Sequence, residues 1–193
     1  MIKPFYQGQL DTFCAIYAVL NALRLLRGLK TLKGRDILND VLISLAGRPK
    51  LFREVLTQET DYISLVDSML QSLEKPYNLK IHSPFSAGSI VERDVFWQAC
   101  MDWMGQENGS ISGKTMVFRF MRYLIPGKEP LNRHWTTLEY INDRHLRLFD
   151  SSHEAEAILS IPKDGCVTEK ALVDKDRLLY VQPDSIRFIA LNV

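Results

Sequence analysis

The feature that most constrains the fold is a change of hydrophobic periodicity near residues 105–113. Before this segment, apolar residues recur every three to four positions, as in amphipathic or buried helices. After it, short aromatic-rich runs alternate with turn residues, as in strands. Helices gathered in one half and strands in the other predict an α+β fold rather than alternating βαβ units. We expect a single domain over 1–193, with a helical lobe over about 1–105 and a sheet lobe over about 114–193.

The same patterns give approximate bounds for the individual elements. Helices are predicted over about 13–29, 36–45, 60–74 and 91–104. Strands are predicted over about 77–82, 115–125, 134–141, 145–149, 158–161, 178–181 and 186–191. The segment Asn142-Asp143-Arg144 separates two of these strands and predicts a hairpin turn.

Composition and charge exclude several classes of partner. The 193 residues are 46% hydrophobic and carry a net charge of +1, so no electrostatic case exists for nucleic acid or anionic lipid as the main partner. No run approaches the roughly 20 apolar residues of a membrane span, and residues 1–9 lack the pattern of a secretory signal. We therefore expect a cytoplasmic protein, or one delivered into a target cell as an effector. Its oligomeric state is not predicted.

The cysteine pattern argues against disulfides and zinc. Cys14, Cys100 and Cys166 are odd in number, and no pair has Cys-x-x-Cys spacing. The Gly-Lys-Thr at 113–115 lacks the upstream glycine and strand of a phosphate-binding loop. We expect no metal and no cofactor.

Cys14 is the strongest candidate for a reactive group. It stands at the predicted start of the most apolar helix, after a polar loop in which Asp11 and Thr12 are possible N-cap residues. The positive end of a helix dipole and the unpaired N–H groups there favour a thiolate, the nucleophilic form of cysteine. The other reading is a small buried hydrophobic residue, which is the commonest role of a lone cysteine.

His134 and Asp150 supply a matching base and carboxylate. His134 opens a predicted strand, and Asp150 ends the other half of the same hairpin. If the turn centres on residues 142 and 143, these two residues are nearly cross-strand partners, and the carboxylate can orient the imidazole. The other histidines are His82, His145 at the distal end of the hairpin, and His153 in a polar loop, which is the best rival.

Two further residue types complete the candidate site. Gln9, or alternatively Gln7, lies shortly before Cys14 and can donate a hydrogen bond to an oxyanion, with the backbone N–H of Cys14 as the second donor. Trp135 follows His134 directly, so its ring is a candidate shield for the His134–Asp150 pair and a candidate substrate contact.

With these residues in order, the chain resembles the papain-like cysteine peptidases. The resemblance lies in Gln9, Leu10, Asp11, Phe13, Cys14, Ala15, Tyr17, Ala18 and Asn21, then in His134-Trp135, and then in Phe149-Asp150-Ser151. Compact bacterial members, such as the leader peptidases of bacteriocin exporters, are the most similar. Two departures are Ala15, where many relatives have glycine, and a Gln-to-Cys gap one residue shorter than usual.

The resemblance implies a fold and a reaction. The fold would be papain-like, with the nucleophile's helix packed on an antiparallel sheet. Cys14 would attack a peptide or isopeptide carbonyl, His134 would transfer the proton, Asp150 would orient His134, and Gln9 would stabilise the oxyanion. A deamidase, transglutaminase or acyltransferase of the same fold, and a non-catalytic peptide-binding module, remain as alternatives. In each case the expected partner is a peptide or protein.

Overall fold

Five α-helices lie in the described part of the chain. The computed structural model describes residues 2–7, 12–105, 113–152 and 158–192. The helices are α1 (Cys14–Arg27), α2 (Thr31–Ala46), α3 (Pro49–Leu56), α4 (Ile63–Tyr77) and α5 (Arg93–Met104). Short 3-10 turns cover Lys163–Gly165, Lys170–Leu172 and Pro183–Ser185. The bounds of α1, α4 and α5 lie within three residues of the predicted ones, which is the usual uncertainty of helix ends.

Two helices differ from the prediction. The sequence pattern does not predict helix α3, because it indicates Pro49 only as the end of the preceding helix. Proline is also favoured in the first turn of a helix, where its missing N–H has no intrahelical partner, and Pro49 begins α3 in this way. Helix α2 starts five residues earlier than predicted and includes Gly34, whose Cα lies so close to Phe5 that a Cβ would meet the phenyl ring at 3.0 Å.

The strands form one sheet. They are β1 (Leu79–His82), β2 (Lys114–Arg122), β3 (Asn132–Ile141), β4 (His145–Leu148), β5 (Ser160–Pro162), β6 (Cys166–Val167), β7 (Leu179–Val181) and β8 (Arg187–Leu191). The order is β1-β8-β2-β3-β4-β5, while β7 pairs with β2 and β6. All pairs are antiparallel except the short β6–β7 pair. The predicted α+β class is therefore confirmed, with β1 inserted into the helical half.

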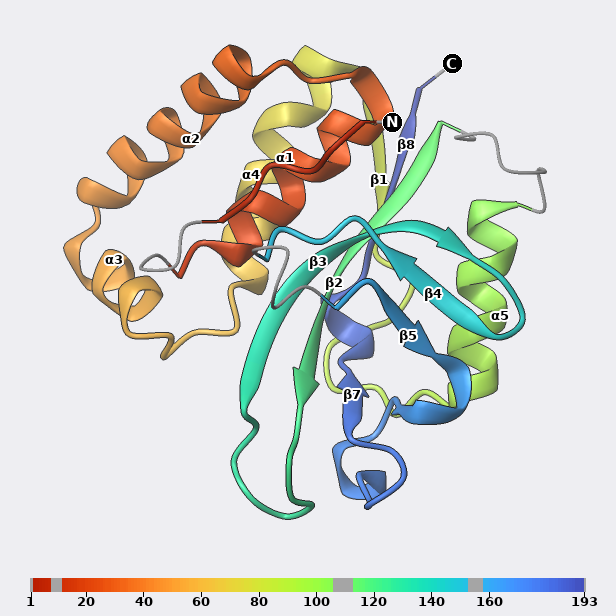
Figure 1. Ribbon diagram of the computed structural model, residues 1–193. Helices are drawn as coiled ribbons and strands as arrows, with labels where there is room; N and C mark the ends of the chain where they lie inside the picture. The colour runs from red at the N-terminus through yellow and green to blue at the C-terminus, as the bar shows by residue number, and fades with distance from the viewer. Residues whose placement is uncertain (1, 8–11, 106–112, 153–157, 193) are drawn as a thin grey trace.

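Helices cover both faces of the sheet (Figure 1). Helices α1 and α4 pack on one face, with Val117 and Trp135 from the strands in their hydrophobic cluster. Helix α5 packs on the other face, against Phe118 and Phe120. Because side chains alternate along a strand, neighbours in β2 and β3 belong to different clusters. Helix α1 runs across the centre of the sheet (Figure 1). Its C-cap residue is Gly28, whose φ of 62° is readily adopted by glycine.

The hairpin of β3 and β4 has a different register from the predicted one. Leu138 pairs with Leu148, and a bulge before Tyr140 shifts the remaining pairs. The turn closes between Asn142 and His145, one residue later than expected. Residues 134 and 150 are therefore not direct cross-strand partners, and the predicted pairing is wrong by about two residues.

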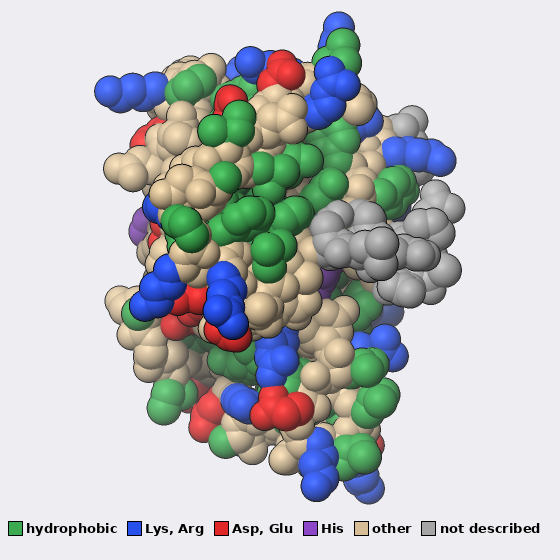
Figure 2. Space-filling view, turned by 90° about the vertical axis from the view of Figure 1, so that its left-hand side faces the viewer, with side chains coloured by type: hydrophobic (Ala, Val, Ile, Leu, Met, Phe, Trp, Pro, Cys, Tyr) green, Lys and Arg blue, Asp and Glu red, His purple; other side chains and the backbone are tan. Residues whose placement is uncertain are grey.

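Helices α2 and α3 form the outer side of the helical half. Hydrophobic side chains gather on this side of the molecule (Figure 2), and Leu32, Ile43 and Leu56 are among the exposed ones. A groove of about 710 Å³ separates α2 from α4. Within the described ranges, no helix combines the length and apolar character that crossing a bilayer requires.

Candidate active site

Cys14 is the first residue of α1 and is nearly buried, with 6% of its surface exposed. The N-cap residue, Phe13, provides no side-chain cap, and the first turn has no acidic residue. Helix α1 therefore begins with unpaired backbone N–H groups and the positive end of its dipole beside the sulfur. Thr12 does not cap the helix as predicted: its hydroxyl donates to the Val55 carbonyl at 3.1 Å. Asp11 lies outside the described residues.

His134 connects Cys14 to Asp150. Its Nε2 lies 2.9 Å from Oδ2 of Asp150, and Cys14 is close enough to the imidazole to raise its pKa. The ring is 5% exposed and meets Phe120 edge to face, with centroids 5.6 Å apart. The structure thus brings His134 into contact with Asp150 and into the neighbourhood of Cys14, although Cys14 and His134 stand 120 positions apart in the sequence.

Asp150 is held by several donors. It follows β4 and is 3% exposed. Its Oδ2 accepts from the Thr136 hydroxyl at 2.8 Å, and its Oδ1 accepts from the Ser152 backbone N–H at 2.7 Å. Burial acts to raise the pKa of Asp150, but the hydrogen bonds and charge of His134, together with the Ser152 bonds, outweigh it and lower that pKa. The carboxylate therefore stays ionised and fixed in orientation.

The protonated form of His134 is strongly favoured. Burial acts to lower the pKa of His134, but the hydrogen bonds and negative charges of Asp150 and Cys14 outweigh burial and raise the pKa to about 10. His134 is therefore an imidazolium at neutral pH, held beside the Asp150 carboxylate.

We expect the His134 ring to stay protonated well above neutral pH. An NMR titration of the imidazole should give a midpoint near 10, and Asp150→Asn should lower it because the carboxylate charge is lost. Since folding raises this pKa, the imidazolium stabilises the fold fully below about pH 6.5, and this contribution is lost as the pH rises through about 10. A midpoint near 6.5 in the wild type would contradict this account of the site.

The remaining predicted site residues are the two glutamines and Trp135, and only Gln7 and Trp135 lie among the described residues. Gln9 lies outside the described residues. The backbone N–H of Gln7 donates to the Ser151 carbonyl at 2.7 Å, so the segment before Cys14 passes beside the end of the triad. Trp135 is 0% exposed and packs toward α1 and α4, with its indole N–H on the Asp61 carbonyl at 2.9 Å. The predicted substrate contact and shield therefore do not fit its position, and Phe120 lies against the His134 ring instead.

Among the described cysteines and histidines, no second site of this kind occurs. Cys100 is fully buried, and burial raises the pKa of its thiol. His82 and His145 lie on β1 and β4, away from the three grouped residues, while His153 lies outside the described ranges.

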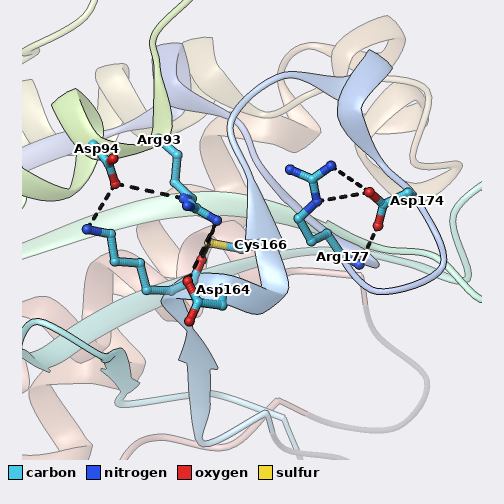
Figure 3. A network of polar contacts seen from close by, with 7 residues as sticks. Arg93, Asp94, Asp164, Cys166, Asp174 and Arg177 are labelled. Carbon is cyan, nitrogen blue, oxygen red and sulfur yellow. Dashed lines mark hydrogen bonds and ion pairs between the residues drawn. The ribbon is translucent and has the colours of Figure 1, made fainter.

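Cys166 belongs to a structural network rather than a reactive site. Figure 3 shows it beside a cluster of ion pairs, in which Lys163 binds Asp94 at 2.9 Å. Its thiol donates to the Lys163 carbonyl at 3.5 Å. Burial, the largest influence, raises the pKa of Cys166 to about 11. At neutral pH this thiol is protonated.

Three residues near the site were not predicted from the sequence. Thr136 and Ser152 each stand two positions after a predicted residue, and this spacing on a strand or tight turn was the available signal. Tyr62 is 5% exposed, adopts a φ of 64°, and donates its hydroxyl to the Val55 carbonyl at 2.7 Å. Burial and the charge of Cys14 raise the pKa of Tyr62 to about 12, so the phenol stays neutral beside the sulfur.

Comparison with known proteins gives no independent assignment. No protein-family model matches the chain, and no curated protein matches it. Within the described ranges, no group of three or more histidine, cysteine, aspartate or glutamate side chains is arranged to hold a metal ion.

Proposed function

We propose that the chain is a papain-like cysteine hydrolase that cleaves a peptide or isopeptide bond. The observation that carries the proposal is the contact of the His134 imidazole with a buried carboxylate at 2.9 Å, at a position where Cys14 also raises the pKa of that imidazole. Nucleophile, base and orienting group in mutual hydrogen-bond reach are the signature of an activated nucleophile. The position of Cys14 at the start of α1, and of His134 on β3, supports this proposal.

The proposed reaction has two halves. The Cys14 thiolate attacks the carbonyl carbon, and the backbone N–H of Cys14 and the amide of Gln9 stabilise the oxyanion. The His134 imidazolium then protonates the leaving amine, so that the C–N bond breaks and a thioester forms. In the second half, neutral His134 takes a proton from water, which attacks the thioester and releases the acid and the thiol. Asp150 keeps the ring oriented throughout.

The test is a substrate-profiling screen that compares the wild type with Cys14→Ala. We expect peptide fragments whose formation requires Cys14, with a water added across the cleaved bond. An intact substrate about one dalton heavier would indicate a deamidase, and a new covalent link would indicate a transglutaminase or acyltransferase. Either outcome would mean that the thioester serves a reaction other than peptide hydrolysis.

A matched control separates catalysis from the loss of any thiol. Cys166→Ala removes a second buried thiol outside the site and should keep the activity. Iodoacetamide at pH 7 should label Cys14 of the wild type much faster than Cys100 or Cys166. Equal, slow labelling of all three would contradict the proposal and favour a non-catalytic binding module.

A further inference from the structure

Arg119 is a buried cation on the face of the sheet that carries helix α1, which begins with Cys14. It lies in β2, directly across from Trp135 in β3, and its neighbour Phe120 is the cross-strand partner of His134. Strand alternation places its side chain on the face of the sheet that carries α1 and α4. Only 7% of Arg119 is exposed. An arginine inside the apolar run Met116–Met121 of β2 is unusual, because charged side chains are seldom buried without a partner.

The guanidinium of Arg119 has no carboxylate partner among the described residues. Its Nη1 donates to Oε1 of Gln182 at 3.1 Å, and Gln182 is itself oriented by a bond from Nε2 to Asp184 at 2.9 Å. This partner is neutral. No carboxylate oxygen in the described ranges lies within 4.0 Å of the guanidinium, although the charge of the exposed Asp61 acts on it from farther away.

A second arginine on the same face shows the usual solution. Arg187 in β8 pairs with Val117 in β2, so it shares the face of Arg119, and it is similarly buried at 6% exposed. Its Nε and Nη2 bind the two carboxylate oxygens of Asp67 at 2.5 and 2.9 Å. A carboxylate of helix α4 therefore neutralises Arg187 through two hydrogen bonds, whereas no carboxylate of the described residues does so for Arg119.

The position of Arg119 relative to Cys14 indicates which group pairs with its guanidinium. The Trp135 indole, directly across from Arg119, donates to the Asp61 carbonyl, and the hydroxyls of Tyr62 and Thr12 both donate to the Val55 carbonyl. These contacts lead from Arg119 to the residue two positions before Cys14. Burial lowers the pKa of Arg119, while the charges of Asp61 and Cys14 act in the opposite direction. The charges of Cys14 and Arg119 both act on the phenol of Tyr62. A planar guanidinium binds a carboxylate through two parallel hydrogen bonds, and such bonds are stronger where water is excluded.

We propose that Arg119 binds a carboxylate of the substrate close to the scissile carbonyl, so that the enzyme prefers acidic substrates. This inference rests on the proposed function, because Cys14 must be the nucleophile for Arg119 to act on specificity. Arg119 would be a specificity residue. It would bind the substrate carboxylate in the way that Arg187 binds the carboxylate of Asp67. The carboxylate is either an acidic side chain or a free C-terminus.

Alkylation of Cys14 tests the inference without a known substrate. Iodoacetate and iodoacetamide both alkylate the thiolate with loss of iodide, but only iodoacetate carries a carboxylate. We expect the ratio of the iodoacetate rate to the iodoacetamide rate to fall about tenfold or more in Arg119→Gln, the size expected for a charge-assisted hydrogen bond. In the wild type, the iodoacetate rate should saturate with reagent concentration, as binding to a site requires. Arg119→Lys should keep part of the preference.

Arg133→Gln is the matched control. It removes the same charge from the same sheet face, but Arg133 is half-buried and paired with Glu129. Its rate ratio should change less than about twofold, because surface ion pairs contribute little. An unchanged ratio in folded Arg119→Gln, with fast iodoacetamide labelling, would overturn the inference alone. Slow iodoacetamide labelling of the wild type would instead overturn the proposed function.

Protection of the wild type keeps the test independent of any variant's folding. Acetyl-glutamate amide carries only a side-chain carboxylate, and acetyl-glutamine carries only a C-terminal carboxylate. One of them should slow iodoacetamide labelling more than acetyl-glutamine amide, which has neither, and the more effective one identifies the source of the carboxylate. Equal labelling rates with all three compounds would count against an anion site at Arg119.

Discussion

Replacing His134 with glutamine is expected to slow both substrate turnover and the alkylation of Cys14 at pH 7 by about 10³-fold, within the range for loss of a general acid–base. Glutamine has a similar length and can still hydrogen-bond Asp150, but it cannot accept the thiol proton. Cys14 would then keep its proton near neutral pH. The measurement is the second-order rate of iodoacetamide labelling at Cys14, followed by peptide mass spectrometry.

The control is His145→Gln, which changes the same residue type on β4 at the far end of the hairpin. This variant should label at the wild-type rate. The rate in His134→Gln should rise as the pH approaches the ordinary pKa of a free thiol, about 8.5, because hydroxide then replaces the lost base. Wild-type labelling rates in folded His134→Gln at pH 7 would exclude His134 as the partner of Cys14.

Replacing Trp135 with alanine is expected to cost about 3–5 kcal/mol in the free energy of unfolding, as for other large aromatic residues in cores. Trp135 is fully buried, lies in the cluster between the sheet and helices α1 and α4, and donates its indole N–H to the Asp61 carbonyl. The substitution leaves a cavity and an unpaired carbonyl. Urea denaturation followed by circular dichroism measures the loss.

Trp103→Ala is the matched comparison. Trp103 is half-buried on α5, stacks on Phe188 with centroids 4.8 Å apart, and donates to the Thr115 carbonyl at 3.0 Å. Its replacement should cost about 1–2 kcal/mol, because less surface returns to water. If Trp135→Ala destabilised the chain no more than Trp103→Ala, the sheet-to-helix packing described here would be wrong.

The predicted contact between His134 and Asp150 forms, although the predicted strand register is wrong. The sequence predicts residues 134 and 150 as near-opposite partners, whereas the bulge before Tyr140 and the later turn displace the pairing by about two residues. The contact still forms at 2.9 Å, because diagonal neighbours on one sheet face lie within reach of longer side chains. A bulge depends on local backbone geometry, which hydrophobic alternation does not specify.

The role predicted for Trp135 fails for a related reason. Adjacency in sequence placed its ring beside His134, but alternation along β3 points the two side chains to opposite faces. The aromatic residue that meets His134 comes from the neighbouring strand, Phe120. Helix α3 was missed because a proline can either end one helix or begin the next.

Local sequence patterns determined the α+β class, most helix and strand positions, and the choice of Cys14, His134 and Asp150 as the candidate site. Hydrophobic periodicity and residue type are local properties, and short stretches of the sequence are therefore enough to recognise them. Only the tertiary structure revealed the Thr136 and Ser152 contacts to Asp150, and that Arg119, in contrast to Arg187, has no carboxylate beside it among the described residues. Whether a buried charge has a partner depends on which distant strands and helices pack together, and this is a property of the folded chain alone.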